Sequence, residues 1–108
     1  MNRGDIFMVT LDPVEGHEQR GHRPVVIVSS GKFNEATRMP IIVPVTRGGD
    51  FARRRGMAVE LSGLKTTGVV RCDQPRALDL TARGATRVEQ IGAAQLEEVM
   101  AKLIAIFE

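Results

Sequence analysis

Hydrophobic residues along the chain fall into short runs separated by polar, glycine-rich stretches. Short runs with loose alternation are typical of β-strands, because neighbouring side chains on a strand point to opposite faces. They predict strands at residues 6–11, 25–28, 41–46, 57–61, 69–73 and 87–91, with residues 76–79 extending the fifth. From residue 93 the spacing becomes helical, and one apolar face is marked by Leu96, Val99, Met100, Leu103, Ile104, Ile106 and Phe107.

These elements predict a mostly β fold with a C-terminal helix. Strands do not alternate with helices, so a doubly wound parallel sheet is not expected. Many short strands with glycine-rich turns favour a small, mostly antiparallel, partly closed barrel. Residues 29–38 are expected to hold a short helix or turn, with Ser30 as its cap. Pro44 has no backbone N–H to donate, so it is expected at a sheet edge or a bulge.

The length of 108 residues predicts a single domain covering residues 1–108. A hydrophobic content of 43% suits a folded globule. The small size makes association with a second copy an expected source of extra burial. The N-terminal residues are polar and no apolar run is long enough to cross a bilayer, so we expect a cytoplasmic protein without membrane contact.

Basic residues gather in two loops, although the formal net charge is only +2. They are Arg20 and Arg23 within residues 12–23, and Arg47, Arg53, Arg54 and Arg55 within residues 47–56. This distribution favours a polyanionic partner, whereas the plainer explanation is an ordinary solvated surface. The chain has four Phe and neither Tyr nor Trp, so arginine planes would do most of any stacking on bases.

Strand 69–73 places a cation and an anion side by side. Val69, Arg71 and Asp73 share one face of this strand, and Cys72 lies on the other. The Arg71–Asp73 pair is either a structural salt bridge or the core of a site for an anionic substrate, and alternation alone leaves both open. Cys72 is the only cysteine, so no intramolecular disulfide forms, and we expect it to be buried as a small hydrophobic residue.

Other familiar chemistries find no support in the residue pattern. No P-loop, G-x-S-x-G or G-x-G-x-x-G motif is present. One cysteine and two loop histidines do not make a zinc site, so neither metal nor cofactor is expected. What remains is a set of polar residues on three separate segments: His17, Glu18, Gln19 and Arg23; Thr46 and Arg47; Arg71 and Asp73. Taken singly, each of them is explained by an ordinary surface position.

Taken together, the three segments supply what RNA cleavage by transesterification needs. One group must take the proton of the ribose 2′-OH, another must protonate the leaving 5′-oxygen, and cations must hold the developing charge. The 2′-OH is itself the nucleophile, so a metal is not required, and DNA, which lacks that hydroxyl, would be spared.

Several segments occur here in a specific combination. They are residues 3–6, 11–13, 16–19, 23–25, 33–34, 44–46, 48–49, 51–53 and, most specifically, 66–76. With them the sequence resembles, over nearly its full length, the MazF/PemK/Kid family of type II toxins, and within it the Kid/PemK branch. The resemblance implies an SH3-like barrel of the CcdB/MazF/Kid type and a two-fold homodimer. It also implies an mRNA interferase, which cleaves single-stranded mRNA to 2′,3′-cyclic phosphate and 5′-OH ends and so inhibits translation and growth.

The resemblance also implies roles for individual residues. In the Kid-like branch Asp73 matches the general base, Arg71 the general acid and phosphate ligand, and His17 a residue that assists at the phosphate. RNA contacts match Thr46, Arg47, Arg55, Met57, Thr67 and Val69, while the MazF branch emphasises Glu18, Arg23 and Thr46; we expect Gln19 and Arg53 to contact RNA as well.

We interpret Asp73 as the base, Arg71 as the phosphate clamp and His17 as a residue that shares the acid role. An arginine is hard to deprotonate, whereas a histidine ordinarily titrates near neutral pH. The expected protein partner is a cognate antitoxin whose acidic, disordered C-terminal tail folds over the basic groove. Two alternatives remain: a CcdB-like gyrase-binding toxin without nuclease activity, and a catalytically silent single-strand-binding module.

Overall fold

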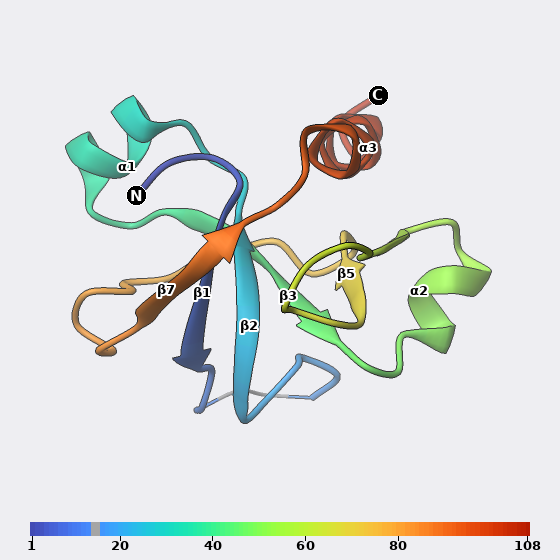
Figure 1. Cartoon of the computed structure of the whole chain (residues 1–108), viewed down its shortest axis with the longest axis horizontal. Coiled ribbons are helices and arrows are strands. Elements are labelled where there is room, and N and C mark those ends of the chain that lie inside the picture. The colour runs from blue at the N-terminus through green and yellow to red at the C-terminus, as the bar shows by residue number, and fades with distance from the viewer. Residues whose placement is uncertain (14–15) are drawn as a thin grey trace.

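Three neighbouring strands form the centre of the structure, a computed structural model that describes residues 1–13 and 16–108 (Figure 1). β1 (Asp5–Thr10), β2 (His22–Ile27) and β3 (Ile41–Thr46) pair antiparallel in this order. The remaining strands are β4 (Ala58–Glu60), β5 (Val69–Arg71), β6 (Arg76–Ala77) and β7 (Thr86–Gln90). Within the described residues the sheet order is β4-β5-β3-β2-β1-β7, with β6 paired to the start of β3.

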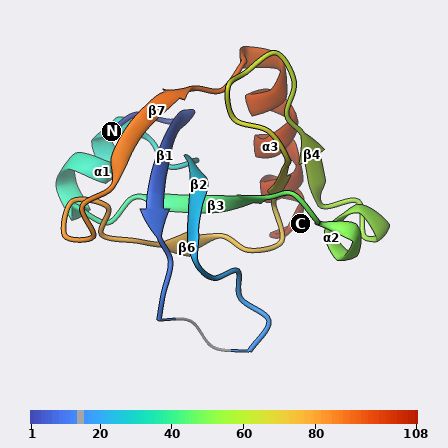
Figure 2. The ribbon, with the colours of Figure 1, turned by 60° about the horizontal axis from the view of Figure 1, so that its bottom comes forward.

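The sheet is antiparallel, as predicted, but it is not closed. β4 pairs only with β5 and β7 only with β1 in the described part of the chain, so the predicted barrel is not confirmed. α3 (Ala93–Ala105) packs against β4, and its Val99 and Leu103 join a core cluster that also contacts Val59 of β4 and Val88 of β7. The helix thus completes the core between the two sheet edges, and Figure 2 shows it beside β4.

Alternation along the central strands builds two cores, one on each face of the sheet. The first cluster contains Ile6, Val26, Val43 and Val45 together with side chains of α3. The second contains the intervening residues of the same strands, namely Phe7, Val9, Leu11, Val25, Ile27 and Ile42, with Leu78 and Leu80. Burial on both faces explains why these strands read as nearly continuous apolar runs.

The terminal helix is confirmed, but its apolar face is only partly covered. Val99 and Leu103 are buried, whereas Ile104, Ile106 and Phe107 are exposed, Phe107 to 87%. The helix ends at Ala105, so the last two apolar positions lie beyond it. No helix among the described residues has the length and apolar character needed to span a membrane.

Several predicted boundaries are wrong. Residues 47–56 were expected to be a loop, yet they contain the short helix α2 (Asp50–Arg54), which is anchored by the fully buried Ala52. β2 begins at His22, inside the predicted polar loop, because His22 pairs with Thr10 of β1. β5 ends at Arg71, so Asp73 lies in a turn and not on a strand.

Pro44 does not lie at a sheet edge. Its strand, β3, is interior: it pairs with β2 on one side and with two short strands on the other. On that second side β6 pairs with Ile41 and Ile42, and β5 with Val45 and Thr46. Pro44 falls in the break between these partners, where no ladder hydrogen bond is required of it.

The short helix predicted near residue 30 is confirmed as α1 (Gly31–Thr37). The Ser30 side chain caps it by accepting a hydrogen bond from the backbone N–H of Phe33 at 3.2 Å. The buried Asn34 fixes α1 to the sheet by donating to the carbonyl oxygens of Met1 and Ser29.

Candidate functional site

The Arg71–Asp73 pair is a bidentate ion pair at the end of β5. Arg71 Nε donates to Asp73 Oδ1 at 2.8 Å and Nη2 donates to Oδ2 at 2.7 Å. The chain turns just after Arg71, where the N–H of Gln74 donates to its carbonyl at 3.1 Å, and this turn brings the carboxylate back to the guanidinium. The exposed fractions of the two side chains are only 8% and 17%, so the pair is shielded from water.

This pairing changes the expected chemistry of Arg71. The hydrogen bonds from its guanidinium to Asp73 raise the pKa of Arg71 above its already high ordinary value, although burial acts in the opposite direction. Arg71 is therefore a still poorer proton donor than a free arginine. The carboxylate of Asp73 has about four lone-pair positions, so two remain available to other partners.

Asp73 lines a pocket of about 280 Å³, which we call the Asp73 pocket. The pocket also takes in His17, Glu18 and Gln19 from the loop between β1 and β2. Two segments that lie far apart in the sequence and were predicted to converge do come together here. The other residues that line the pocket are Leu11, Pro44, Gln74, Pro75 and Arg76. Arg71 is not among the described lining residues and reaches this pocket through Asp73.

A second and larger depression, of about 650 Å³, holds another part of the predicted set, and we call it the Arg47 groove. Its lining includes four of the predicted RNA-contact residues, Arg23, Thr46, Arg47 and Thr67. His22, Lys65 and Thr66 lie beside them, with Met8, Pro24, Val45, Gly48 and Val88. Every ionisable side chain in this described lining is basic, so the groove suits an anionic ligand.

The two depressions lie at the same end of the central strands but on opposite faces of the sheet. Leu11, which lines the Asp73 pocket, belongs to the second core cluster. Val45, which lines the Arg47 groove, belongs to the first. β3 contributes to both, since Pro44 lines the pocket, whereas Val45 and Thr46 line the groove. The loop between β1 and β2 supplies the pocket with residues 17–19, and the start of β2 supplies the groove with residues 22–24.

Close packing and one acidic side chain shape the wall of the Arg47 groove. Gly68 has a φ of +125°, and a Cβ there would lie 2.5 Å from the Thr46 carbonyl oxygen, so only glycine lets β5 approach β3 this closely. The Glu89 carboxylate accepts from the backbone N–H groups of Lys65 and Thr66 and from the Thr66 hydroxyl. These bonds, the hydroxyl bond foremost, lower the pKa of Glu89.

Four predicted RNA-contact residues lie in neither depression. Val69 is fully buried, and its side chain packs against the turn at Gly49. Met57 is half-buried and packs against the first core cluster. The Arg53 guanidinium bonds Asp50, Glu60 and the Gly48 carbonyl, and Arg55 stacks on the Phe51 ring with its guanidinium carbon 4.1 Å from the ring centroid. Contacts within the fold thus engage each of these side chains, although Arg53 and Arg55 remain exposed.

The structure also brings in residues that sequence reasoning missed. Gln74 and Arg76 line the Asp73 pocket, and Lys65 and His22 line the Arg47 groove. All four stand within three residues of a predicted site residue, so proximity in sequence was an available signal. Arg76 carries a buried Nη1 atom for which the described residues provide no hydrogen-bond partner.

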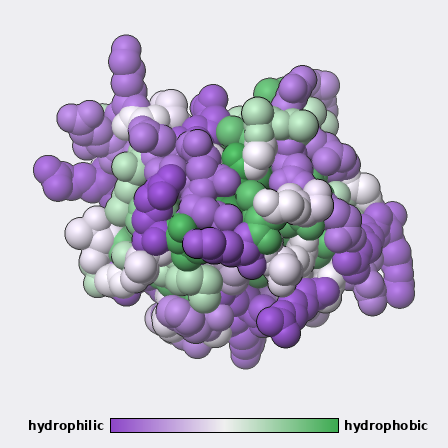
Figure 3. Space-filling model, in the orientation of Figure 1, coloured by the Kyte–Doolittle hydropathy of each residue, from purple (hydrophilic) through white to green (hydrophobic). Residues whose placement is uncertain are grey.

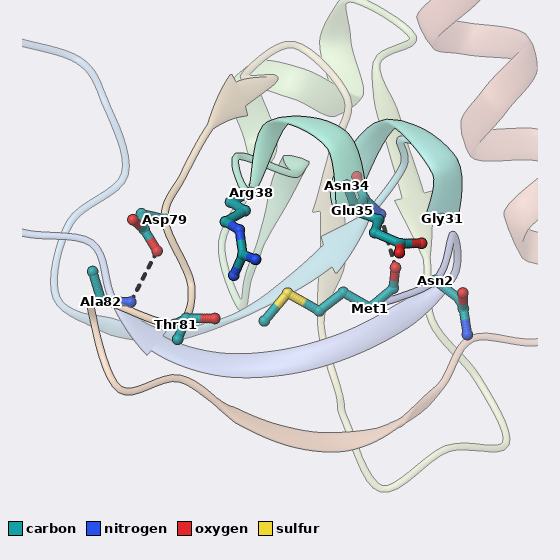
Figure 4. A pocket seen from close by; sticks show the side chains of 9 residues that line it. All are labelled: Met1, Asn2, Gly31, Asn34, Glu35, Arg38, Asp79, Thr81 and Ala82. Carbon is teal, nitrogen blue, oxygen red and sulfur yellow. Dashed lines mark hydrogen bonds between the residues drawn. The ribbon is translucent and has the colours of Figure 1, made fainter.

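A further cleft, of about 720 Å³, lies elsewhere and contains none of the predicted residues. It opens between the N-terminus, α1 and residues 79–82, as Figure 4 shows. Its charged residues are of both signs, with Arg38 facing a cleft that also holds Glu35 and Asp79. On the face drawn in Figure 3 polar residues cover most of the surface, with apolar patches between them.

Comparison with known protein families gives a match over almost the whole chain. A family model described as "PemK-like, MazF-like toxin of type II toxin-antitoxin system" matches residues 2–107. Escherichia coli endoribonuclease PemK is 54% identical over 108 residues, which cover 98% of this chain and 81% of PemK. The endoribonuclease toxin MazF of E. coli strain K12 is 36% identical over 102 residues, covering 93% of this chain and 87% of MazF.

Solved structures agree on the fold. MazF from Deinococcus radiodurans superposes with a TM-score of 0.89 at 30% identity, covering 99% of this chain and 96% of that one. A MazE–MazF structure from the same organism gives a TM-score of 0.83, also at 30% identity, with coverage of 99% and 95%. The similarity therefore extends to MazF solved both alone and together with MazE.

Proposed function

The chain belongs to the PemK-like, MazF-like family of type II toxin–antitoxin toxins, and from this membership we propose that it is an endoribonuclease that cleaves single-stranded mRNA and so inhibits growth. The observation that carries the proposal is the Asp73 pocket, where a carboxylate and a histidine from distant segments line one cavity. The names of the relatives favour this function over the gyrase-binding alternative.

Asp73 acts as the general base in the proposed reaction. One of its free lone pairs takes the proton of a ribose 2′-OH, and the resulting oxygen attacks the adjacent phosphorus. The bond from phosphorus to the 5′-oxygen breaks, which leaves a 2′,3′-cyclic phosphate. His17, in the same pocket, donates a proton to the departing 5′-oxygen and so completes the 5′-OH end. The nucleophile comes from the substrate, so the proposed reaction proceeds without a metal.

In this scheme Arg71 orients the base, Asp73, and places a positive charge beside it. Its two bonds hold both oxygens of Asp73, and its positive charge lies next to the phosphate that Asp73 approaches. The raised pKa of Arg71 makes His17 the better general acid of the two. Arg71 thus stabilises negative charge in the transition state and keeps its own proton.

The Arg47 groove holds the flanking RNA in this proposal. Arg23, Arg47 and Lys65 supply positive charge for phosphates, and Thr46 and Thr67 supply hydroxyls. Glu18 and Gln19 contact RNA at the Asp73 pocket itself. Val69 and Met57 are packed against neighbouring side chains, so they are left out of the proposed contacts, whereas the exposed Arg53 and Arg55 remain proposed RNA contacts outside the groove.

A direct assay tests the function. Purified protein is incubated in EDTA with a mixed-sequence RNA and, as a matched control, with a DNA of the same sequence. We expect the RNA alone to be cut, leaving 2′,3′-cyclic phosphate ends that resist ligation until they are opened. Intact RNA, together with capture of purified gyrase, would instead support the gyrase-binding alternative.

We also propose a cognate antitoxin as partner, and the cytoplasm, where mRNA is translated, as the place of action. An acidic, disordered tail lying in the Arg47 groove would meet basic side chains and no acidic one among the described lining residues, and would block RNA there. The MazE–MazF structure of the relative supports a partner of this kind.

A homodimer is proposed from the exposed end of α3. An apolar groove of about 420 Å³ lies between this helix and β6, lined by Val28, Ile41, Met100 and Leu103 among others, and the exposed Phe107 stands at its rim. This surface carries both a hydrophobic side chain and a hydrophobic groove, so two copies can bury both in a two-fold contact. Analytical ultracentrifugation of wild type and Phe107→Ser tests it: we expect a dimer that weakens in the variant.

A further inference from the structure

The side-chain amide of Gln74 joins the two segments of the Asp73 pocket. Its Oε1 accepts a hydrogen bond from the backbone N–H of Gln19 at 2.9 Å. Its Nε2 donates to the backbone carbonyl of His17 at 3.1 Å. These partners lie 55 and 57 residues away in the chain, and Gln74 directly follows Asp73. The turn that carries the proposed base therefore also holds the loop that carries the proposed acid.

The two contacts require both ends of an amide. The N–H of Gln19 needs an acceptor and the carbonyl of His17 needs a donor, and a glutamine side chain offers one of each in a fixed arrangement. A flipped amide would set donor against donor and acceptor against acceptor, so the paired contacts define its orientation. A carboxylate can satisfy only the Gln19 contact, and an alanine satisfies neither.

We propose that Gln74 is a positioning residue, which holds His17 beside Asp73 for the proton transfer and does not itself react. This inference rests on the proposed function, because it assigns Gln74 a part in the same reaction. Displacing a reacting group by about 1 Å can lower the reaction rate about a hundredfold. Holding the backbone of the His17 loop in place should therefore account for a large part of the rate acceleration that His17 provides.

A double-mutant cycle separates positioning from direct action. The rate of the chemical step and the RNA dissociation constant are measured for wild type, His17→Ala, Gln74→Ala and the double variant. We expect Gln74→Ala to slow cleavage about 10- to 100-fold with a dissociation constant within about threefold of wild type. In the His17→Ala background the same change should slow cleavage no further. An equal slowing in both backgrounds, or a loss confined to RNA binding, would overturn the proposal.

Hydrogen exchange tests the clamp without any cleavage. The Gln19 amide donates to Gln74, so its exchange should become about tenfold faster or more in Gln74→Ala, and stay at the wild-type rate in Gln90→Ala, a control at an exposed position on β7. Unchanged exchange in Gln74→Ala would refute the clamp. If wild type cuts no RNA, the proposed function fails, whereas the exchange result still decides whether the clamp exists.

Gln74→Glu provides a second variant that keeps most of the side chain. Its carboxylate can accept from the Gln19 N–H but cannot donate to the His17 carbonyl. We expect the Gln19 amide to stay protected while the cleavage rate falls between those of wild type and Gln74→Ala. A wild-type cleavage rate in this variant would show that the His17 contact is not used.

Discussion

The Asp73 pocket and the Arg47 groove lie at one end of the same three strands, yet they are built differently. The pocket is small and closely tied: Arg71 holds both oxygens of Asp73, and Gln74 holds two backbone groups of the facing loop. The groove is more than twice as large and is lined by basic and hydroxyl side chains. Fixed geometry suits proton transfer, whereas a broad positive surface suits the binding of a flexible polyanion.

This difference predicts that changes in the two regions affect different measured quantities. Substitutions of the proposed acid and base, His17 and Asp73, should lower the cleavage rate and leave RNA affinity nearly unchanged. Substitutions in the Arg47 groove should lower affinity and its dependence on salt. The two histidines offer a matched pair for this test, because His17 lines the pocket and His22 lines the groove.

In this comparison of pocket and groove, the largest expected effect comes from His17→Ala. Removing a general acid typically slows a reaction about 10²- to 10⁴-fold, so we expect a loss in kcat of this size with little change in KM. His22→Ala, the control, should change kcat less than about threefold. Steady-state kinetics on one short RNA provides both values. Equal losses in the two variants would erase the distinction between pocket and groove.

Next in size is the effect of Arg71→Ala on stability. The variant leaves a largely buried carboxylate without its bidentate partner, and breaking such a pair by removing one side costs about 3 kcal/mol. Urea unfolding of wild type and variant measures the difference in free energy of unfolding. The control Arg53→Ala breaks ion pairs that are more exposed, so it should cost much less. Similar costs would show that the Arg71–Asp73 pair is not specially shielded.

A smaller effect is expected when the groove loses charge. The double variant Arg47→Ala/Lys65→Ala removes two phosphate contacts, so the slope of log binding constant against log salt should become shallower by about 1.4. The control Lys32→Ala/Arg38→Ala removes the same charge from exposed positions in α1 and at its C-cap, and should change the slope by less than about half as much. Binding titrations at several salt concentrations give the slopes, and equal changes would place RNA outside the groove.

The smallest effect concerns the wall of the groove and depends on pH. The pKa of Glu89 is lowered from its ordinary value of 4.5, so its hydrogen bonds to residues 65 and 66 stabilise the fold at pH values above 4.5. This contribution is lost as the pH falls through the lowered pKa. Thermal unfolding of Glu89→Gln should therefore show a lower Tm than wild type at pH 7. The gap should narrow as the pH falls below about 4.5. A gap that does not change with pH would contradict this assignment.

Local pattern was enough to predict the centre of the molecule. β1, β2 and β3 have alternating residues that enter two cores, so hydrophobic alternation reports their burial directly. The terminal helix was predicted for the same reason, since Val99 and Leu103 recur at helical spacing and are buried. α2 could not be found in this way, because Ala52 is its only buried residue among arginines and a phenylalanine that face solvent.

The candidate site was predicted less completely, because part of it depends on tertiary contacts. The resemblance of residues 16–19 and 66–76 to the toxin family pointed to His17 and Asp73, and the fold brings these two residues to one pocket. Sequence alone could not show that Gln74 bridges them, because its partners lie more than fifty residues away. It also could not show that Val69 is fully buried, since the approach of Gly49 to its side chain follows from the three-dimensional packing.

In the proposed division of roles, Asp73 and His17 carry out the proton transfers in the Asp73 pocket, and the Arg47 groove supplies most of the RNA affinity. The most direct test measures, on one RNA and under one set of conditions, the cleavage rate and the dissociation constant of Asp73→Asn. This variant keeps an oxygen that can accept from Arg71 but loses the base. We predict a loss in cleavage rate of about 10³-fold or more with a dissociation constant within about threefold of wild type. Cleavage at the wild-type rate would contradict the account.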